Sequence, residues 1–334
     1  MTSSRPIAIF YEHPHWFEPL FAELSERDIP HVKIDAARHV FDPARAEEDF
    51  SLVFNRMSPS AWKRGAGAAI FSTRDYLTHL ESRGVPVFNG ARAFLLETSK
   101  ALQVSLLERL ALPVPRTRVV NHLTLLPLAA RSLDFPLVVK PNIGGSGAGI
   151  VRFDKLLELS AAVDSGAITG GLDGTLLLQE YHPPRGSSIV RVETLEARYL
   201  YGIRIHLGEE ATFDLCPANV CKTVDGADLA SAACPVGAGK AGLTVEAYTP
   251  PPEVVRQVER IAQASHLDVG GIEYLESTRD GRLYFYDVNA LSNFVADPVR
   301  VVGFDPTEKL VDALIARAGL EAEAPAAAAG GQRP

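Results

Sequence analysis

The sequence predicts an α/β (α+β) protein whose first domain is Rossmann-like and whose later domains mix strands and helices. Three observations predict this class. Apolar strands alternate with helical stretches at the start of the chain, a strand ending in a lysine precedes a glycine-rich loop, and an acidic hairpin lies near the C-terminus. With 334 residues, the chain can bury a sizeable core in two or three domains.

The first domain is predicted over residues 1–95. Apolar residues recur at helical spacing over 15–27 and 76–83, and the predicted strands are 6–11, 31–35, 51–57 and 85–90. Such alternation is typical of a parallel sheet. His13, His15 and Trp16 follow the first strand, at the sheet edge where ligands of such folds bind, and are candidates for a substrate contact.

Residues 96–180 and 181–318 are predicted as two further domains, and 319–334 as a disordered tail. The second domain begins with a helix over 97–110, which two prolines end, and the third contains an amphipathic helix over 252–266. The strands expected in these domains are 116–120, 136–140, 150–153 and part of 170–205. The alanine-rich tail lacks the apolar content of a packed segment.

Composition limits the classes of partner. Apolar residues make up 46% of the chain and charged residues 22%, as in ordinary globular proteins. The net charge of −8 argues against nucleic-acid and acidic-membrane partners, and no apolar run approaches the ~18 residues of a membrane helix. The apolar N-terminal stretch is too short for a signal peptide, and three cysteines do not suggest a disulfide scaffold. We therefore expect a cytoplasmic protein with small-molecule partners, and a homodimer is left open.

The glycine-rich loop PNIGGSGAG follows Lys140, which ends a predicted strand, and leads into a second strand. A P-loop and a dinucleotide fingerprint both require a following helix, and a protein-kinase loop precedes its lysine, so none of the three fits. A glycine-rich hairpin tip can offer backbone N–H groups to an anion, and Ser146 adds a hydroxyl. Lys140 supplies a positive charge for phosphate oxygens. The alternative is a flexible surface hairpin, beside which the lysine would be a coincidence.

A hairpin is predicted near the C-terminus, with its turn at residues 279–281. A three-residue loop with glycine in the left-handed position pairs Thr278 with Arg282. Counting back along both strands then places Glu273 opposite Asp287. A two-residue loop would instead send Glu273 to the other face of the sheet, so the prediction depends on the turn.

The same hairpin predicts a magnesium site. Because strand side chains alternate, Asn289 shares the face of Asp287, and both lie close to Glu273. Two neighbouring carboxylates repel each other unless a cation lies between them. Oxygen ligands favour Mg²⁺, which proteins often hold with one or two carboxylates and substrate phosphates. The alternative is a solvated charged strand face, against which the apolar flanking residues argue.

Lys140 with its glycine loop, the Gln-Glu-Tyr stretch at 179–181 and the Asp-x-Asn stretch at 287–289 resemble, in this order, the ATP-grasp superfamily. Within it, the chain is similar to the carboxylate–amine and amino-acid ligase branch, which contains ribosomal-protein glutamate ligases and D-alanine–D-alanine ligases. The resemblance covers about residues 95–315. It implies that the Rossmann-like region is the pre-ATP-grasp domain, the second domain the small lid subdomain and the third the subdomain with the magnesium site.

The resemblance also implies roles for the matching residues. The implied phosphate contacts are Lys100, Lys140, Gly144, Gly145, Ser146 and Gly147. The implied adenine contacts are the Glu180 carboxylate, the backbone of Tyr181 and His182, and the side chains of Val138, Leu275 and Phe285. The implied magnesium ligands are Glu273, Asp287 and Asn289.

Arg191 and Arg204, with Lys140, are the implied catalytic residues, because they resemble arginines that contact the γ-phosphate or the acyl phosphate formed from it. Arg204 lies in an apolar strand, where an unpaired charge is costly, and this favours an anionic partner. Glu193 offers Arg191 an alternative partner on the same strand face.

The chain departs from the family pattern at the ribose. Many relatives carry an acidic ribose-binding residue where this chain has Ile189, and Ser187 or Ser188 is the candidate substitute.

The long segment 214–243 has weak periodicity and contains Cys216, Cys221 and Cys234. With His206, these cysteines are loosely spaced for zinc, but they lack a tight Cys-x-x-Cys pair, so we interpret them as buried thiols. A substrate contact by Cys216 or Cys221 is left open. Long irregular segments are often functional, and this one is expected to help select the substrates.

The implied reaction joins a carboxylate to an amine at the expense of ATP, through an acyl phosphate, and releases ADP and phosphate. The enzyme would be a carbon–nitrogen ligase that uses Mg²⁺, with Mn²⁺ as a substitute, on a small metabolite or amino acid. The alternatives are an ATP-dependent phosphotransferase of the same fold, a non-catalytic ATP-binding regulatory protein and a biotin-dependent carboxylase subunit. The carboxylase would normally be longer, and the full set of metal-ligand candidates argues against the regulatory protein.

Overall fold

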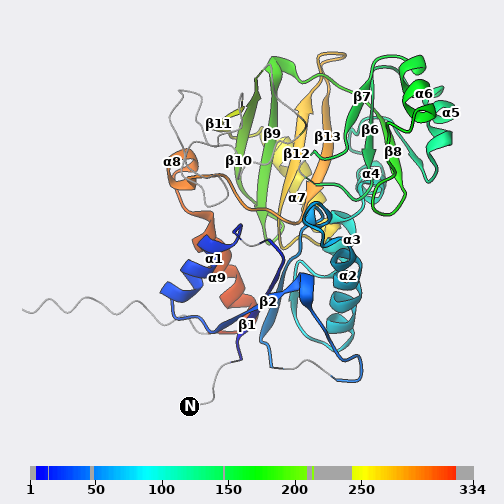
Figure 1. Ribbon diagram of the computed structural model, residues 1–334. Coiled ribbons are helices and arrows are strands. Elements are labelled where there is room, and N and C mark those ends of the chain that lie inside the picture. The colour runs from blue at the N-terminus through cyan, green and yellow to red at the C-terminus, as the bar shows by residue number, and fades with distance from the viewer. Residues whose placement is uncertain are drawn as a thin grey trace, which may run out of the picture.

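The computed structural model describes residues 5–13, 15–45, 49–145, 147–208, 213 and 243–320. Ser146 and all three cysteines lie outside the described residues, as do residues 321–334 of the predicted tail. Three sheets organise the described part of the chain (Figure 1).

The N-terminal sheet is parallel, in the order β2-β1-β3-β4, as the alternating pattern predicts. Its elements are β1 (Ile7–Tyr11), α1 (Glu18–Glu26), β2 (His31–Asp35), β3 (Leu52–Arg56), α2 (Gly67–Ser82), β4 (Val87–Phe88) and α3 (Ala91–Glu97). Ile7 and Ile9 pack in the same core as α1, whereas Ala8 and Phe10 pack in the core that contains α2. Helices therefore cover both faces, and the inner strand β1 is a continuous apolar run.

The small second sheet is antiparallel, in the order β5-β8-β6-β7. The elements of this region are α4 (Lys100–Arg109), β5 (Thr117–Val120), α5 (Leu126–Ala130), β6 (Leu137–Pro141), β7 (Val151–Phe153), α6 (Leu156–Asp164) and β8 (Leu176–Glu180). Its own small core joins strand residues such as Leu137 and Leu178 to Leu126 of α5 and Leu159 of α6. The glycine-rich loop connects β6 to β7, so the predicted hairpin is confirmed.

The third sheet is antiparallel, in the order β11-β10-β9-β12-β13. Its region comprises β9 (Ser188–Leu195), β10 (Arg198–Leu207), β11 (Leu243–Ala247), α7 (Pro252–Ser265), β12 (Val269–Glu276), β13 (Leu283–Asn289), α8 (Pro298–Val302) and α9 (Pro306–Ala318). Val190, Val192 and Ile272 pack with Val258 and Ile261 of α7 on one face. Arg191 and Glu273, which alternate with these residues along β9 and β12, point to the opposite face and line a cavity that the small sheet also borders.

Two predicted boundaries differ from the structure. The helix expected over 97–110 is two helices, because the chain turns at Thr98 and Ser99, and the Ser99 hydroxyl caps α4 by accepting from Leu102 N–H at 3.3 Å. Helix α9, expected with the third domain, packs instead in the core of β1 and β3, beside α1 (Figure 1). The end of the described chain therefore returns to the N-terminal domain.

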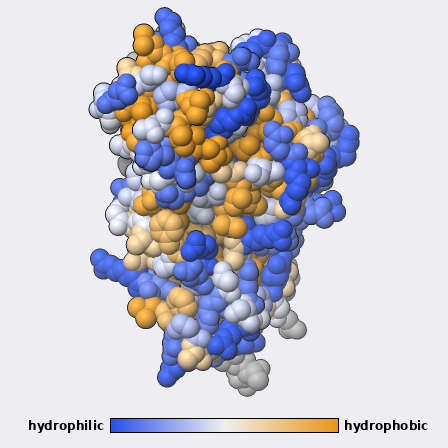
Figure 2. Space-filling view, turned by 90° about the vertical axis from the view of Figure 1, so that its right-hand side faces the viewer, coloured by the Kyte–Doolittle hydropathy of each residue, from blue (hydrophilic) through white to orange (hydrophobic). Residues whose placement is uncertain are grey.

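No described helix has the length and apolar character to cross a membrane. On the face shown in Figure 2, apolar side chains are more frequent in the upper half, where the small subdomain lies, than in the lower half. Exposed apolar residues of this subdomain include Leu128 on α5 and Leu157 on α6.

Candidate active site

One cavity of about 690 Å³ lies where the three sheets meet. The N-terminal domain contributes Trp16 and residues 58–60, the small sheet contributes β6, β8 and the glycine loop, and the third sheet contributes β9, β12 and β13. The predicted site residues that line the cavity are Lys100, Val138, Lys140, Gly144, Gly145, Gly147, Glu180, Tyr181, His182, Arg191, Glu273, Leu275, Asp287 and Asn289.

The metal-ligand candidates converge as predicted, although the turn differs. Ser277, not Thr278, lies opposite Arg282: its N–H donates to the Arg282 carbonyl at 2.8 Å, and a four-residue loop with Gly281 at φ 71° closes the hairpin. Farther along, β13 has a bulge, and beyond it Glu273 pairs with Asp287. The longer turn and the bulge each shift the register by one residue, and the two shifts cancel at this pair.

The bulge overturns one prediction for the adenine pocket. Tyr274 pairs with Phe285 on the turn side of the bulge, and Phe285 is fully buried in the core against α7. The extra residue, Tyr286, lines the cavity instead, together with the predicted Leu275. Phe285 therefore cannot enclose a base.

Charged side chains neutralise one another around these ligands. The Lys100 ammonium donates to Asp287, and Arg191 Nη1 donates to Glu273 Oε1 at 2.8 Å. Arg191 Nε donates to Glu193 at 2.6 Å, so the predicted Glu193 pair exists, but it is buried rather than superficial. A Cβ at Gly271 would lie 2.3 Å from Arg191 Nη2, so glycine is required there to admit the guanidinium.

Burial perturbs the ionisation of the lysines and carboxylates. Burial and the charge of Lys100 lower the pKa of Lys140 to about 7. Burial alone would raise the pKa of Asp287, but Lys100 and Lys140 hold it below its usual value. Burial raises the pKa of Glu97, a further cavity-lining carboxyl, to about 7. Strongly shifted groups gathered in one cavity are typical of a functional site.

The glycine loop packs closely against the N-terminal domain. A Cβ at Gly145 would lie 2.6 Å from Ser60 Cβ, so only glycine lets the loop backbone approach residues 58–60. Gly144 lies beside Lys100, since an added Cβ there would be 3.4 Å from Lys100 Cε. The loop backbone and both lysines therefore border one volume, as a phosphate cradle requires.

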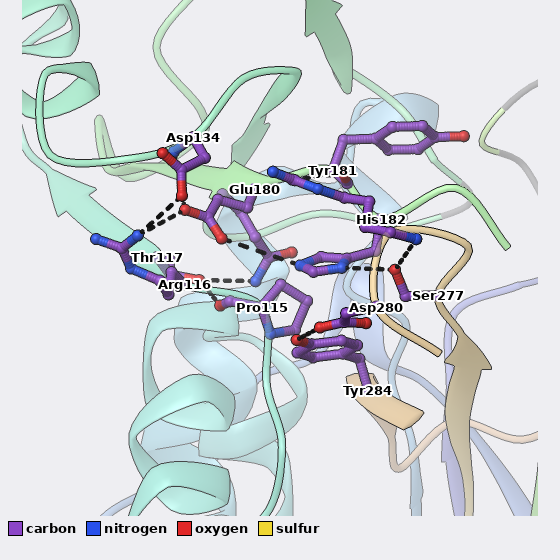
Figure 3. Close-up of polar contacts among 12 residues, drawn as sticks. Pro115, Arg116, Thr117, Asp134, Glu180, Tyr181, His182, Ser277, Asp280 and Tyr284 are labelled. Atoms are coloured by element: carbon purple, nitrogen blue, oxygen red, sulfur yellow. Dashed lines mark hydrogen bonds and ion pairs between the residues drawn. The ribbon is translucent and has the colours of Figure 1, made fainter. Parts of the chain in front are cut away.

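At the other end of the cavity lie the predicted adenine contacts at residues 180–182, which we call the hinge. A polar network holds the hinge in place (Figure 3). Glu180 Oε1 accepts from Asp134 N–H at 2.9 Å and from Arg116 at 3.1 Å, and Oε2 lies 4.0 Å from His182 Nε2. The Tyr181 N–H donates to the Pro136 carbonyl at 2.8 Å, and the Tyr181 carbonyl accepts from Arg279 at 3.3 Å. The Tyr181 N–H is thus committed to a protein partner, and the carbonyl, which can accept a second hydrogen bond, is the part of this backbone that remains for the expected contact with the base.

Gln179, which the sequence did not single out, is oriented toward the same end of the cavity. The Thr117 hydroxyl donates to the Pro115 carbonyl at 2.7 Å, so it must accept from Gln179 Nε2 at 2.8 Å. This leaves Gln179 Oε1 as a hydrogen-bond acceptor for a ligand. Gln179 is buried and lines the cavity.

Two further predictions fail on strand alternation. Arg204 lies opposite Val190 in the β9–β10 ladder and so shares the face that packs on α7, whereas Arg191 faces the cavity. The Arg204 guanidinium lies over the Tyr248 ring, 4.1 Å from the ring centroid. This cation–π contact is the partner that we expected for a charge in an apolar strand. Ser188 does not line the cavity, whereas Ile189 does.

Trp16 is the member of the His13–Trp16 group that lines the cavity. His13 stacks on its ring at a centroid distance of 3.9 Å, and burial lowers the pKa of His13 to about 4. His15 is exposed and contacts Glu18 at 3.0 Å. These contacts make Trp16 a wall of the cavity and His13 its support.

The donor set fits a hard divalent cation. Glu273, Asp287 and Asn289 offer only oxygen ligands, and Asn289 Nδ2 is buried without a partner among the described residues, as an amide that turns its oxygen to an ion would be. No group of three or more His, Cys, Asp and Glu in the described ranges could hold a metal by itself. Mg²⁺ held by so few protein ligands usually takes its other oxygens from water and substrate phosphates.

Comparison with known proteins assigns the fold. No family model and no curated protein matches the sequence. The structure of the ATP-grasp ligase PsnB with minimal precursor matches with a TM-score of 0.66 and 20% identity, over 94% of this chain and 99% of PsnB. An ATP-grasp RimK domain protein from Sphaerobacter thermophilus has a TM-score of 0.63 and 20% identity, over 93% and 99%. D-alanine–D-alanine ligase from Bacillus anthracis has a TM-score of 0.62 and 16% identity, over 94% and 97%.

The chain therefore has the ATP-grasp fold, with a parallel α/β domain in front of it, and the predicted fold class is confirmed. Other structures of PsnB contain Mg and ADP, or a precursor peptide and AMPPNP, and one structure of the Bacillus anthracis ligase contains ATP.

Proposed function

We propose that this protein is an ATP-dependent carboxylate–amine ligase, which forms an amide bond through an acyl phosphate and releases ADP and phosphate. The observation that carries the proposal is the convergence of the glycine loop, the buried Lys140, the partly buried Lys100 and a set of oxygen ligands in one cavity. Solved ligases of this fold contain ATP, ADP or AMPPNP, and one contains Mg with ADP, which supports ATP and Mg²⁺ as the nucleotide and metal.

The two ends of the cavity have different tasks in this proposal. The adenine lies at the hinge, beside Gln179 and His182, and the phosphates lie under the glycine loop, beside Lys100 and Lys140. Mg²⁺, held by the carboxylate hairpin, neutralises phosphate charge when it is bound. Lys140 and the loop N–H groups stabilise the transferring phosphoryl group, and positioning and electrostatics supply most of the rate.

Arg191 is the remaining cation that we propose for the acyl-phosphate region. Glu193 and Glu273 hold its guanidinium rigidly on the cavity face of β9. Arg204 has no part in the reaction, because it lies on the other face of the sheet. The glycine loop and residues 58–60 together exclude water, which would otherwise hydrolyse an acyl phosphate.

The substrates are proposed to bind against the N-terminal domain, where Trp16, Ser58 and Ser60 line the cavity with Asn293. A small metabolite or amino acid is the substrate class that we favour. PsnB is seen with a precursor peptide, so short peptides belong in the same test.

The decisive experiment is an ADP-release screen over amino acids, small carboxylates and short peptides, singly and in pairs, with and without hydroxylamine. We expect ADP release to require a carboxylate, and hydroxylamine to trap the acyl phosphate as a hydroxamate. Lys140→Ala and Asp287→Ala should each abolish ADP release in folded protein. Wild-type turnover in either variant would overturn the proposal, and ADP release without hydroxamate would favour a phosphotransferase.

A further inference from the structure

The open edge of β13 is covered by side chains instead of a strand. β13 is an outer strand of its sheet, so one side of its backbone has no neighbouring strand. Gln103 of α4 reaches this edge: its Oε1 accepts from Val288 N–H at 3.2 Å and its Nε2 donates to the Val288 carbonyl at 2.8 Å. Val288 stands between Asp287 and Asn289, so one amide grips the residue that separates two candidate metal ligands.

The orientation of this amide is fixed by its partners. Nε2 also donates to the Leu96 carbonyl at 2.9 Å, and carbonyls only accept, while the Val288 N–H only donates. A flipped amide would lose all three hydrogen bonds. Gln103 is 3% exposed and does not line the cavity, so it can act on a ligand only through the residues that it holds, and two of its three hydrogen bonds go to Val288 of β13.

The hydrogen bonds from Gln103 to Val288 lie next to an interruption of the β12–β13 ladder. The bulge at Tyr286 interrupts the β12–β13 ladder directly before Asp287, and a bulge leaves its extra residue unpaired. On the open side, Pro113 accepts from Phe285 N–H at 2.9 Å before the bulge, and the Glu97 carboxylate accepts from Ala290 N–H after it. Between these two contacts, Gln103 is the side chain that fixes the backbone.

We propose that Gln103 is a positioning residue for the magnesium site. It holds the Val288 peptide so that Asp287 and Asn289 present their oxygens to one ion. This inference rests on the proposed function, since the metal is the one that accompanies the nucleotide phosphates. Without the amide, both side chains turn with the strand and the fit to a single ion is lost, whereas the hinge and the lysines keep their places.

The test compares Gln103→Met and Gln103→Glu with the wild type. Methionine has a similar length and no amide, and glutamate keeps the acceptor for Val288 N–H but loses the donor. Titration of Mn²⁺ into protein saturated with ADP, followed by electron paramagnetic resonance, measures the metal affinity. Gln103→Met should weaken Mn²⁺ binding by roughly 10–100-fold, the range for residues that support metal ligands. Gln103→Glu should weaken it as well, because its second oxygen would face the Leu96 and Val288 carbonyls, which can only accept. ADP binding in EDTA should be unchanged in both.

Ser265→Ala is the matched control. The Ser265 hydroxyl is buried and donates to the Ile261 carbonyl at 2.6 Å within α7, so its removal deletes a buried hydrogen bond in which no residue of β13 takes part. It should lower the melting temperature and leave Mn²⁺ affinity at the wild-type value. If both Gln103 variants bind Mn²⁺ as the wild type does, the proposal is wrong, and if Gln103→Met does not fold, Gln103→Glu decides alone. A wild type that binds no ADP would instead refute the proposed function.

Discussion

Thr117 gives the sharpest test of how the cavity reads a base. Its hydroxyl donates to the Pro115 carbonyl (Figure 3) and accepts from Gln179 Nε2, which leaves Gln179 Oε1 as an acceptor for a ligand. We predict that this oxygen accepts from the 6-amino group of adenine, because Gln179 is a buried residue of the cavity wall and Thr117 fixes which of its amide atoms is available. Guanine carries an oxygen in place of that amino group. This oxygen and Gln179 Oε1 are both hydrogen-bond acceptors, so they would repel each other. Thr117→Val removes the hydroxyl at nearly constant shape and frees the Gln179 amide to flip.

The magnitude follows from one hydrogen bond for each base. A neutral hydrogen bond contributes about 0.5–1.5 kcal/mol net, so losing the fixed acceptor should weaken ADP binding by roughly 2–10-fold. The flipped amide presents Nε2 to the guanine oxygen, and this should strengthen GDP binding by a similar factor. The preference for ADP over GDP should therefore fall by roughly 4–100-fold, which corresponds to about 0.8–2.7 kcal/mol.

Isothermal titration calorimetry with ADP and GDP, in the presence of Mg²⁺, measures this preference. Thr117→Ser keeps the hydroxyl and is the control, so its ADP-to-GDP ratio should match the wild type. A folded Thr117→Val protein with the wild-type ratio would refute the orientation of Gln179. An equal loss in Thr117→Ser would trace the effect to packing of the methyl group instead.

Three further predictions follow from the charges. Since burial and Lys100 lower the pKa of Lys140 to about 7, and a bound phosphate restores its charge, ADP binding at pH 8 should take up nearly one proton and at pH 6 almost none. Calorimetry in two buffers of different ionisation enthalpy checks this, and equal uptake at both pH values would contradict it. Asp287→Asn should abolish the Mg²⁺ dependence of ADP affinity, because an amide does not supply the negative charge that holds the ion, and it should also lower the melting temperature, because Lys100 loses its ion-pair partner; an unchanged Mg²⁺ titration would place the metal elsewhere. Arg204→Met should bind ADP as the wild type does, since Arg204 packs on Tyr248 away from the cavity, and a tenfold loss would return it to the site.

The sequence was sufficient for those parts of the site that depend on residue type and chain order. A lysine that ends a strand before a glycine-rich loop has few structural uses, and the structure places Lys140 and the loop on the cavity wall. The sequence does not single out Glu97, because the pattern predicts one long helix that begins with it. In the structure α3 ends at Glu97 and α4 begins at Lys100, and both residues line the cavity. Gln179 was missed because its role depends on Thr117, which lies 62 positions away in the chain and opposite it in the sheet.

Face assignment accounts for the error at Arg204, and a hydrogen bond between distant residues accounts for the occupied N–H of Tyr181. Period-2 alternation was known for each strand, but the sequence does not say which of the two faces meets the cavity. For Arg204, the apolar context was correctly read as a demand for a partner, and an aromatic ring with Glu246 at 4.0 Å meets that demand on the α7 side. For Tyr181, the edge of β8 is already bonded to Pro136, a contact between residues distant in the chain.

The hairpin shows why a prediction can be right at one position and wrong two residues away. The turn is one residue longer than expected, and β13 contains one extra residue at Tyr286. The predicted pairing of the two strands is therefore wrong only between the turn and the bulge. Asp287 lies beyond both and faces the cavity as counted, whereas Phe285 lies between them and turns into the core. No local signal marks the bulge, because Tyr286 is one aromatic residue among three. The bulge also breaks the ladder beside the metal ligands, which is why their backbone depends on support from α4, and why Gln103 rather than β12 alone should set the geometry of the ion.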